Sequence, residues 1–76
     1  SGIHVIQVNK NGKFAKHGIQ KGFIILRVNN KNIRQVSDLE DALKEVNNSA
    51  NTDNALFISG IYPNGKSAYY AINLQD

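Results

Sequence analysis

The sequence predicts a small α+β domain in which a mostly antiparallel sheet is covered by one main helix. Three stretches of the 76-residue chain lead to this prediction. Residues 23–28 form an apolar run between turn residues, which is typical of a central strand. Residues 37–47 have the capping residues and the apolar spacing of a helix. Residues 55–62 and 67–74 are strand-like runs joined by Pro-Asn-Gly-Lys, which indicates a hairpin.

The N-terminal quarter predicts a strand followed by a short helix. Residues 2–8 alternate between two faces except where Val5 and Ile6 follow one another, so we expect a bulge or a strand buried on both faces. Residues 13–17 are long enough for one or two helical turns. Gly18 is expected to end them, because glycine adopts positive φ without strain.

Asparagine marks both tight turns. Asn29 and Asn30 directly follow the central strand and predict a turn, because Asn tolerates positive φ. Ile33 then lies in a short returning strand. In the C-terminal hairpin, Asn64-Gly65 predicts a type I′ turn, in which both residues have positive φ.

The main helix is expected to begin with a capping box. Ser37 would accept the amide of Glu40, and the Glu40 side chain would reach back to the Ser37 amide. Val36 precedes this cap and would pack onto the first turn. One apolar stripe follows at helical spacing, made of Leu39, Ala42, Leu43 and Val46.

Composition indicates a single domain over residues 1–76 and excludes several classes of protein. The chain has no cysteine, and no apolar run approaches the ~18 residues of a membrane span. Seven of its nine Lys and Arg residues precede Asp38, the first acidic residue, and the net charge is +3. An uneven basic charge admits a nucleic-acid or anion surface, although a solvated basic face is the more usual explanation.

No catalytic or cofactor-binding constellation is present. No serine lies in a nucleophile motif, and His4 and His17 stand alone rather than at metal-ligand spacing. The carboxylates around Asp38 suit a helix N-terminus without a metal. We therefore expect no enzyme activity, no metal and no cofactor in this chain.

The segment Gly18-Ile19-Gln20-Lys21-Gly22 with residues 23–33 resembles the most recognisable part of a PDZ domain. The order strand, short helix, strand, capped helix and hairpin is similar to the circularly permuted PDZ domains of bacterial proteases. Residues 1–8 look like the strand that enters the module in HtrA/Deg-type serine proteases. Residues 60–66 with 69–72 look like the final hairpin of the last PDZ domain in Bacteroides-type members. Phe23 departs from that pattern, because most such domains have Asp after the second glycine. The resemblance implies a small, partly open β-barrel or sandwich with one main and one short helix.

This resemblance also implies a function. PDZ domains bind peptides by β-strand addition, and the helix wall of the site would be Val36, Leu39, Glu40 and Leu43. For Leu39 and Leu43, simple core packing is the alternative. The implied partners are polypeptide C-termini or unfolded segments and an upstream protease domain, in the periplasm or cell envelope. Alternatives are a module of another membrane-associated protease or secretion protein, or a basic-surface nucleic-acid or anion binder.

In the protease PDZ domains, the groove strand and its carboxylate-binding loop precede the segment matching residues 2–8. We therefore expect this chain to be a fragment that lacks the groove strand. Its absence would expose a sheet edge made of Ile3, His4, Val5 and Ile6. Exposed edges recruit other chains, so the sequence predicts self-association through this edge.

Overall fold

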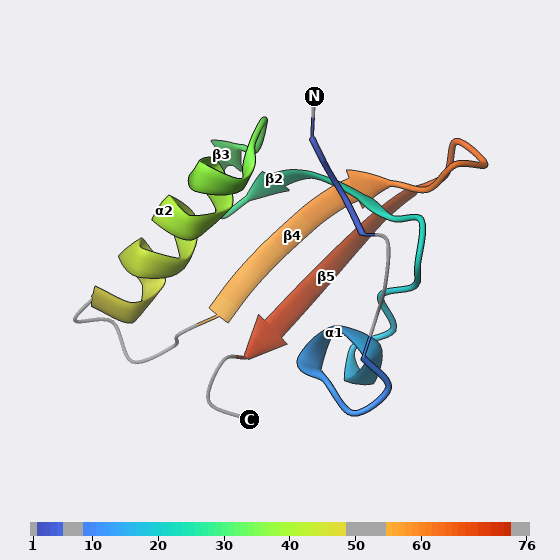
Figure 1. Cartoon of the computed structure of the whole chain (residues 1–76), viewed down its shortest axis with the longest axis horizontal. Coiled ribbons are helices and arrows are strands. Elements are labelled where there is room, and N and C mark those ends of the chain that lie inside the picture. The colour runs from blue at the N-terminus through green and yellow to red at the C-terminus, as the bar shows by residue number, and fades with distance from the viewer. Residues whose placement is uncertain (1, 6–8, 49–54, 74–76) are drawn as a thin grey trace.

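A computed structural model describes residues 2–5, 9–48 and 55–73 (Figure 1). The elements follow one another as β1 (Ile3–His4), α1 (Lys13–Lys16), β2 (Ile24–Val28), β3 (Lys31–Asn32), α2 (Val36–Asn48), β4 (Ala55–Ile61) and β5 (Ser67–Asn73). Two predicted strands, residues 2–8 and 67–74, extend beyond the described residues, because residues 6–8 and 74 lie outside them.

The strands form one open antiparallel sheet. Its order is β1-β2-β4-β5, and β3 pairs with the far end of β2. The prediction that residues 23–28 supply a central strand is confirmed, because β2 lies between β1 and β4. The two longest strands, β4 and β5, form the C-terminal hairpin and run side by side in Figure 1. The small α+β class with an antiparallel sheet that the sequence predicted is therefore the one observed.

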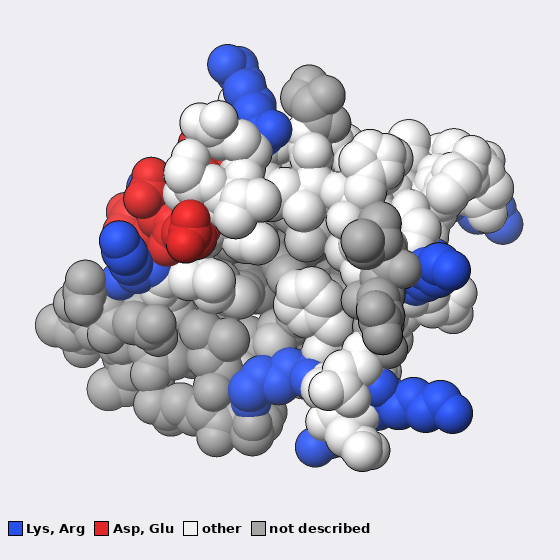
Figure 2. All heavy atoms as spheres, in the orientation of Figure 1, with Lys and Arg blue, Asp and Glu red and all other residues white. Residues whose placement is uncertain are grey.

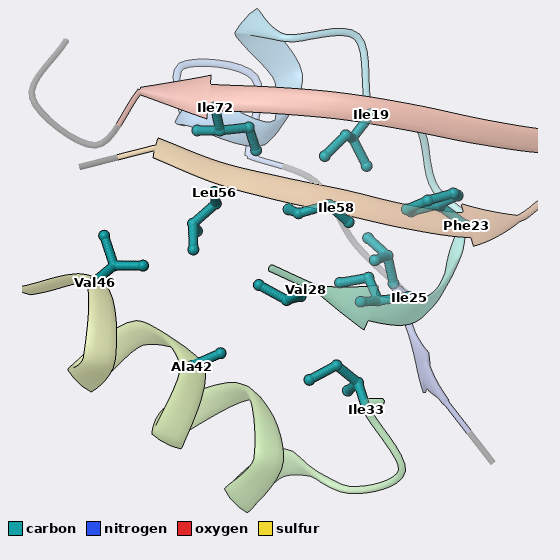
Figure 3. Packing of buried hydrophobic residues seen from close by; sticks show 11 residues of the cluster. Ile19, Phe23, Ile25, Val28, Ile33, Ala42, Val46, Leu56, Ile58 and Ile72 are labelled. Atoms are coloured by element: carbon teal, nitrogen blue, oxygen red, sulfur yellow. The ribbon is translucent and has the colours of Figure 1, made fainter. Parts of the chain in front are cut away.

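The core lies between α2 and one face of the sheet. Figure 3 shows Ala42 and Val46 of α2 pointing toward Val28 of β2 and Leu56 of β4. The buried cluster consists of Val5, Ile19, Phe23, Ile25, Val28, Ile33, Ala42, Val46, Leu56, Ile58 and Ile72. Each large side chain buried in this way contributes roughly 1.5–3 kcal/mol, and this packing holds α2 on the sheet.

Phe23 lies at the end of the core next to the hairpin. Its side chain is completely buried, and its ring centroid lies 4.9 Å from that of Tyr62 and 5.3 Å from that of Tyr70. The hydroxyls of the two tyrosines are 2.6 Å apart, and the Gln20 amide donates to the Tyr62 hydroxyl at 3.0 Å. The unusual Phe after Gly22 is thus a core residue that anchors the loop before β2 against the hairpin.

An irregularity in β2 decides which way its side chains point. The pairing with β4 shifts between Ile25 and Arg27, so Ile25 and Val28 are both buried while Arg27 is exposed. At Val5 and Ile6 the sequence predicted a bulge or a strand buried on both faces, and Ile6 lies outside the described residues. Gly60 of β4 faces this irregularity, where a Cβ atom would overlap the carbonyl of Ile24.

The predicted capping box at Ser37 is wrong. Helix α2 begins one residue earlier, at Val36, so Ser37 lies inside it. The carboxylate of Asp38 accepts the amides of Arg34 at 2.9 Å and Gln35 at 3.2 Å. A charged acceptor that satisfies two amides outcompetes a hydroxyl that would satisfy one. Val36 does not pack onto the first turn either, since it is 63% exposed.

The two asparagine turns differ. Asn29 and Asn30 both have positive φ, 48° and 69°, as predicted. In the C-terminal hairpin only Gly65 has positive φ, so the predicted type I′ turn is wrong. The Gly65 amide donates to the Tyr62 carbonyl, and the Tyr62 amide to the Lys66 carbonyl, both at 2.9 Å. This is the three-residue connection in which a left-handed glycine follows a tight turn.

Candidate functional site

One flank of α2 carries the apolar residues that the sequence assigned to a binding wall. At about 100° per residue, Val36, Leu39 and Leu43 fall on the same side of the buried stripe of Ala42 and Val46. Leu39 and Leu43 are half-buried and pack against the core cluster. Val36 is exposed one turn before them, so this flank presents a short apolar surface to solvent.

Glu40 lies beside this apolar flank and is exposed. The sequence analysis gave Glu40 a second role in the capping box, but the cap belongs to Asp38. Glu40 is therefore available to a ligand at the edge of the apolar surface. Leu39 and Leu43 combine core packing with a surface that a ligand can reach, because each side chain is half-buried.

The opposite flank of α2 is acidic and turns toward β3. Lys31 of β3 forms an ion pair with Glu45, and the hydrogen bond that Lys31 donates to the Glu45 carboxylate raises the pKa of Lys31. Figure 2 shows the acidic side chains gathered over α2, whereas Lys and Arg lie mainly around other parts of this face. A polyanionic ligand would be repelled at α2, so the charge of this helix favours a polypeptide over a polyphosphate there.

Strand β1 forms one end of the sheet. Ile3 and His4 pair with Ile25 and Ile24 of β2. The Val5 amide donates to the Phe23 carbonyl, and the Val5 carbonyl accepts the Gly22 amide, both at 2.8 Å. Alternate residues of an antiparallel edge strand turn their backbone groups outward. His4 therefore presents its amide and carbonyl to the open side of the sheet.

The four residues of the predicted sheet edge differ from one another in solvent exposure. His4 is exposed and Ile3 is half-buried. The Val5 side chain is only 9% exposed and belongs to the core, so it offers nothing to a partner. Ile6 lies outside the described residues. Self-association through this edge stays a prediction.

The described residues contain no group that suggests catalysis. No buried side chain among them is polar or charged, and no three of their His, Asp and Glu side chains are grouped to hold a metal ion. No helix in the described ranges is both long enough and apolar enough to cross a bilayer. What this surface offers is contact: an apolar helix flank and an open strand edge.

Sequence reasoning missed the outer face of the sheet. Phe57 lies in the predicted strand over residues 55–62, and its side chain is 63% exposed. Successive side chains of a strand point to opposite faces, and this alternation could have predicted the exposure of Phe57. Because Leu56 and Ile58 point to the core, Phe57 must point away from it. Of the adjacent Tyr69 and Tyr70 in β5, Tyr69 is 79% exposed, whereas the Tyr70 ring lies against Phe23.

Comparison with known families bears directly on these surfaces. A family model described as a PDZ domain matches residues 4–52, which is more than half of the chain and runs from β1 past the end of α2. No curated protein matches the chain. The matched range contains both the open strand edge and the apolar flank of α2, and the fold agrees with that family. The chain therefore belongs to the PDZ domain family, whose members are generally non-catalytic modules that bind polypeptide C-termini or other protein segments.

Proposed function

We propose that this PDZ domain is a regulatory module of an HtrA/Deg-type, trypsin-like serine protease of the periplasm or cell envelope. Its task would be to hold substrate tails or to bring protomers into contact, while an upstream domain performs the hydrolysis. The support for the protease context is the resemblance of the first and last segments of the chain to PDZ domains of such proteases.

The observation that carries the binding role is the apolar flank of α2. Val36 is 63% exposed, and Leu39 and Leu43 continue its surface into the core. A ligand side chain laid on this flank would be removed from water at a gain of roughly 25 cal/mol per Å² of apolar area. Main-chain hydrogen bonds to an open strand edge would supply the remaining affinity.

Binding is tested with a fluorescent ten-residue peptide that ends in an apolar residue with a free carboxylate. Val36→Ser should weaken binding about tenfold, because roughly 1.4 kcal/mol of apolar contact is lost. Leu43→Ser should weaken it at least as much, and Lys44→Ser on the neighbouring exposed position should leave it within about twofold. Val36 is mostly in solvent, so its replacement separates ligand contact from folding. Equal affinities for Val36→Ser and Lys44→Ser would refute the helix-flank site.

Salt dependence separates this function from anion binding. A protein that neutralises several phosphates loses affinity steeply as salt rises, whereas apolar contact and strand addition do not. Affinity for the peptide should therefore change little between 50 and 200 mM salt, the range over which phosphate-dependent binding falls by orders of magnitude. A steep fall would favour the basic-surface alternative.

The protease context is tested on the full-length gene product with a fluorophosphonate probe, which labels activated serines. A labelled serine outside residues 1–76 supports the proposal. A full-length product without a labelled serine overturns the protease context and leaves the peptide-binding role to its own test.

A further inference from the structure

The sheet face that points away from α2 contains a hollow of about 550 Å³. Its lining comes from β2, the turn after β2, and both strands of the C-terminal hairpin. Its lining includes Arg27, Asn30, Phe57, Ser59, Tyr69 and Ala71. Phe57, Ser59, Tyr69 and Ala71 lie beyond residue 52, where the match to the PDZ family model ends.

Strand register places these side chains on one face. Arg27 pairs with Ser59, and Ser59 pairs with Tyr69, so the three form one row across β2, β4 and β5. Phe57 pairs with Ala71 in a neighbouring row, two residues before Ser59 on β4. Directly paired residues project to the same side of a sheet. That side is the outer one, because the residues between them on β4 and β5 point to the core.

The two rows form a chequered pattern of small and large side chains. Ser59 and Ala71 are small and form the floor, while Phe57 and Tyr69 stand diagonally across it as walls. Phe57 is 63% and Tyr69 79% exposed, although both rings carry a large apolar area. Aromatic and arginine side chains are enriched at protein interfaces, and Tyr, Trp and Arg are among the few residues that dominate the binding energy. A face with two unburied aromatic rings and one arginine has that composition.

Arg27 supplies a fixed positive charge at one end of the hollow. Its Nη2 donates to the Asn30 carbonyl at 3.2 Å, which holds the side chain along the turn. The turn itself is fixed, because the Asn29 side chain accepts the Phe57 amide at 2.8 Å and donates to the Ala55 carbonyl at 3.3 Å. Within the described ranges no carboxylate forms an ion pair with Arg27. Its remaining donors suit a carboxylate, which arginine binds through two parallel hydrogen bonds.

We infer that this hollow is a second polypeptide-binding site, and that it takes a segment with an acidic residue next to an aromatic or aliphatic one. The carboxylate would pair with Arg27, and the apolar side chain would lie between Phe57 and Tyr69 over Ser59. A nucleic acid fits less well, because its affinity depends on several phosphate contacts and the lining contains one cation. The hollow shares no residue with the α2 flank, so the domain could hold two segments at once.

The experiment is an amide chemical-shift titration of the isotope-labelled 76-residue chain. The probe is an eight-residue peptide with a phenylalanine between two glutamates, acetylated and amidated so that it has no free carboxyl terminus. A second peptide has glutamines in place of the glutamates. Shifts should concentrate at residues 27, 57–59 and 69–71, and the glutamate peptide should bind about tenfold tighter, as expected for hydrogen bonds to a charged group.

Three variants test the contacts separately. Arg27→Gln should remove the preference for the glutamate peptide, whereas Arg34→Gln, at an exposed arginine of the α2 side, should preserve it. Ser59→Leu should weaken binding of both peptides at least tenfold, because the larger side chain fills the floor of the hollow while Arg27, Phe57 and Tyr69 stay in place. Its amide spectrum outside the outer face reports that the fold is intact.

Several results would overturn the inference. These are equal affinity for the two peptides, shifts confined to residues 36–43, or a loss of affinity that Arg34→Gln shows as strongly as Arg27→Gln. Tighter binding of an oligothymidine that is lost in Ser59→Leu would assign the face to nucleic acid. Concentration-dependent dimerisation lost in Ser59→Leu would assign it to a second copy. None of these results depends on Val36→Ser, so the binding site on α2 is tested independently of the hollow.

Discussion

Replacing Asp38 tests how the N-terminal end of α2 is held. In the structure its carboxylate accepts two backbone amides, those of Arg34 and Gln35, which precede the helix. Ser37, the residue that the sequence pattern favoured as the cap, lies inside the helix. The two explanations predict opposite results for the pair of variants Asp38→Ala and Ser37→Ala.

The size of the effect follows from these contacts. Loss of a helix-capping side chain costs about 1 kcal/mol, with a range of roughly 0.5–2. Asp38→Ala removes the acceptor of two amides as well as a negative charge at the positive end of the helix dipole, so we expect about 1–2 kcal/mol. Asp38→Asn keeps an acceptor and loses the charge, which should cost about 0.3–1 kcal/mol. Ser37→Ala should lie within about 0.5 kcal/mol of the parent, because alanine favours the helix.

Urea unfolding followed by circular dichroism measures these differences, and thermal unfolding gives a second estimate. For a domain of this size, 1 kcal/mol corresponds to a shift of about 4–8 °C in Tm. The slope of the urea transition should be the same for all variants, because the area exposed on unfolding is unchanged. If Ser37→Ala cost more than Asp38→Ala, the capping scheme of the structure would be refuted and the capping box restored.

Three further predictions concern the sheet and the hairpin. Gly60→Ala should destabilise the domain by about 3 kcal/mol or more, because the new Cβ would overlap the Ile24 carbonyl and lie 2.6 Å from the Phe23 ring; a loss below about 1 kcal/mol in urea unfolding would contradict the close approach of β4 to β2. Burial first, and then the hydrogen bond with Tyr62, raise the pKa of Tyr70 from 10.0 to about 12. The unfolded chain therefore loses this proton first, so stability present below pH 10 should fall as the pH rises through 12; Tyr70→Phe should flatten that part of the profile, and an unchanged profile would argue against the pair. Self-association through the β1 edge should appear in sedimentation at high protein concentration. His4→Pro should abolish it, because proline removes the outward-facing amide at this position. A monomer at every concentration would exclude self-association.

Short sequence patterns predicted the helices, strands and turns correctly where a residue type is compatible with only one local backbone conformation. The apolar run before Asn29 and Asn30 predicted β2 and its turn, because only a few residues tolerate the positive φ that the turn requires. The hairpin was located correctly but its turn type was not. Asn-Gly is compatible with several connections, and the pairing of β4 with β5 selected the one in which only Gly65 is left-handed.

The helix cap shows a similar limit. Both Ser37 and Asp38 are good capping residues, and sequence alone cannot say at which residue the backbone becomes helical. Packing of Ala42 and Val46 on the sheet sets the position and rotation of α2. The rotation then leaves Val36 in solvent and turns Leu39 and Leu43 half toward it.

By itself the sequence determined the order of strands and helices and the family of the domain, because these depend on local periodicity and on turn residues that are close together in the chain. Only the tertiary structure decided which residues share a surface. Arg27, Ser59 and Tyr69 are separated by up to 42 positions, and they form one row because β2 shifts its register with β4 and β4 pairs with β5. Register is set by the packing of whole strands on a common core, and no local pattern contains that information.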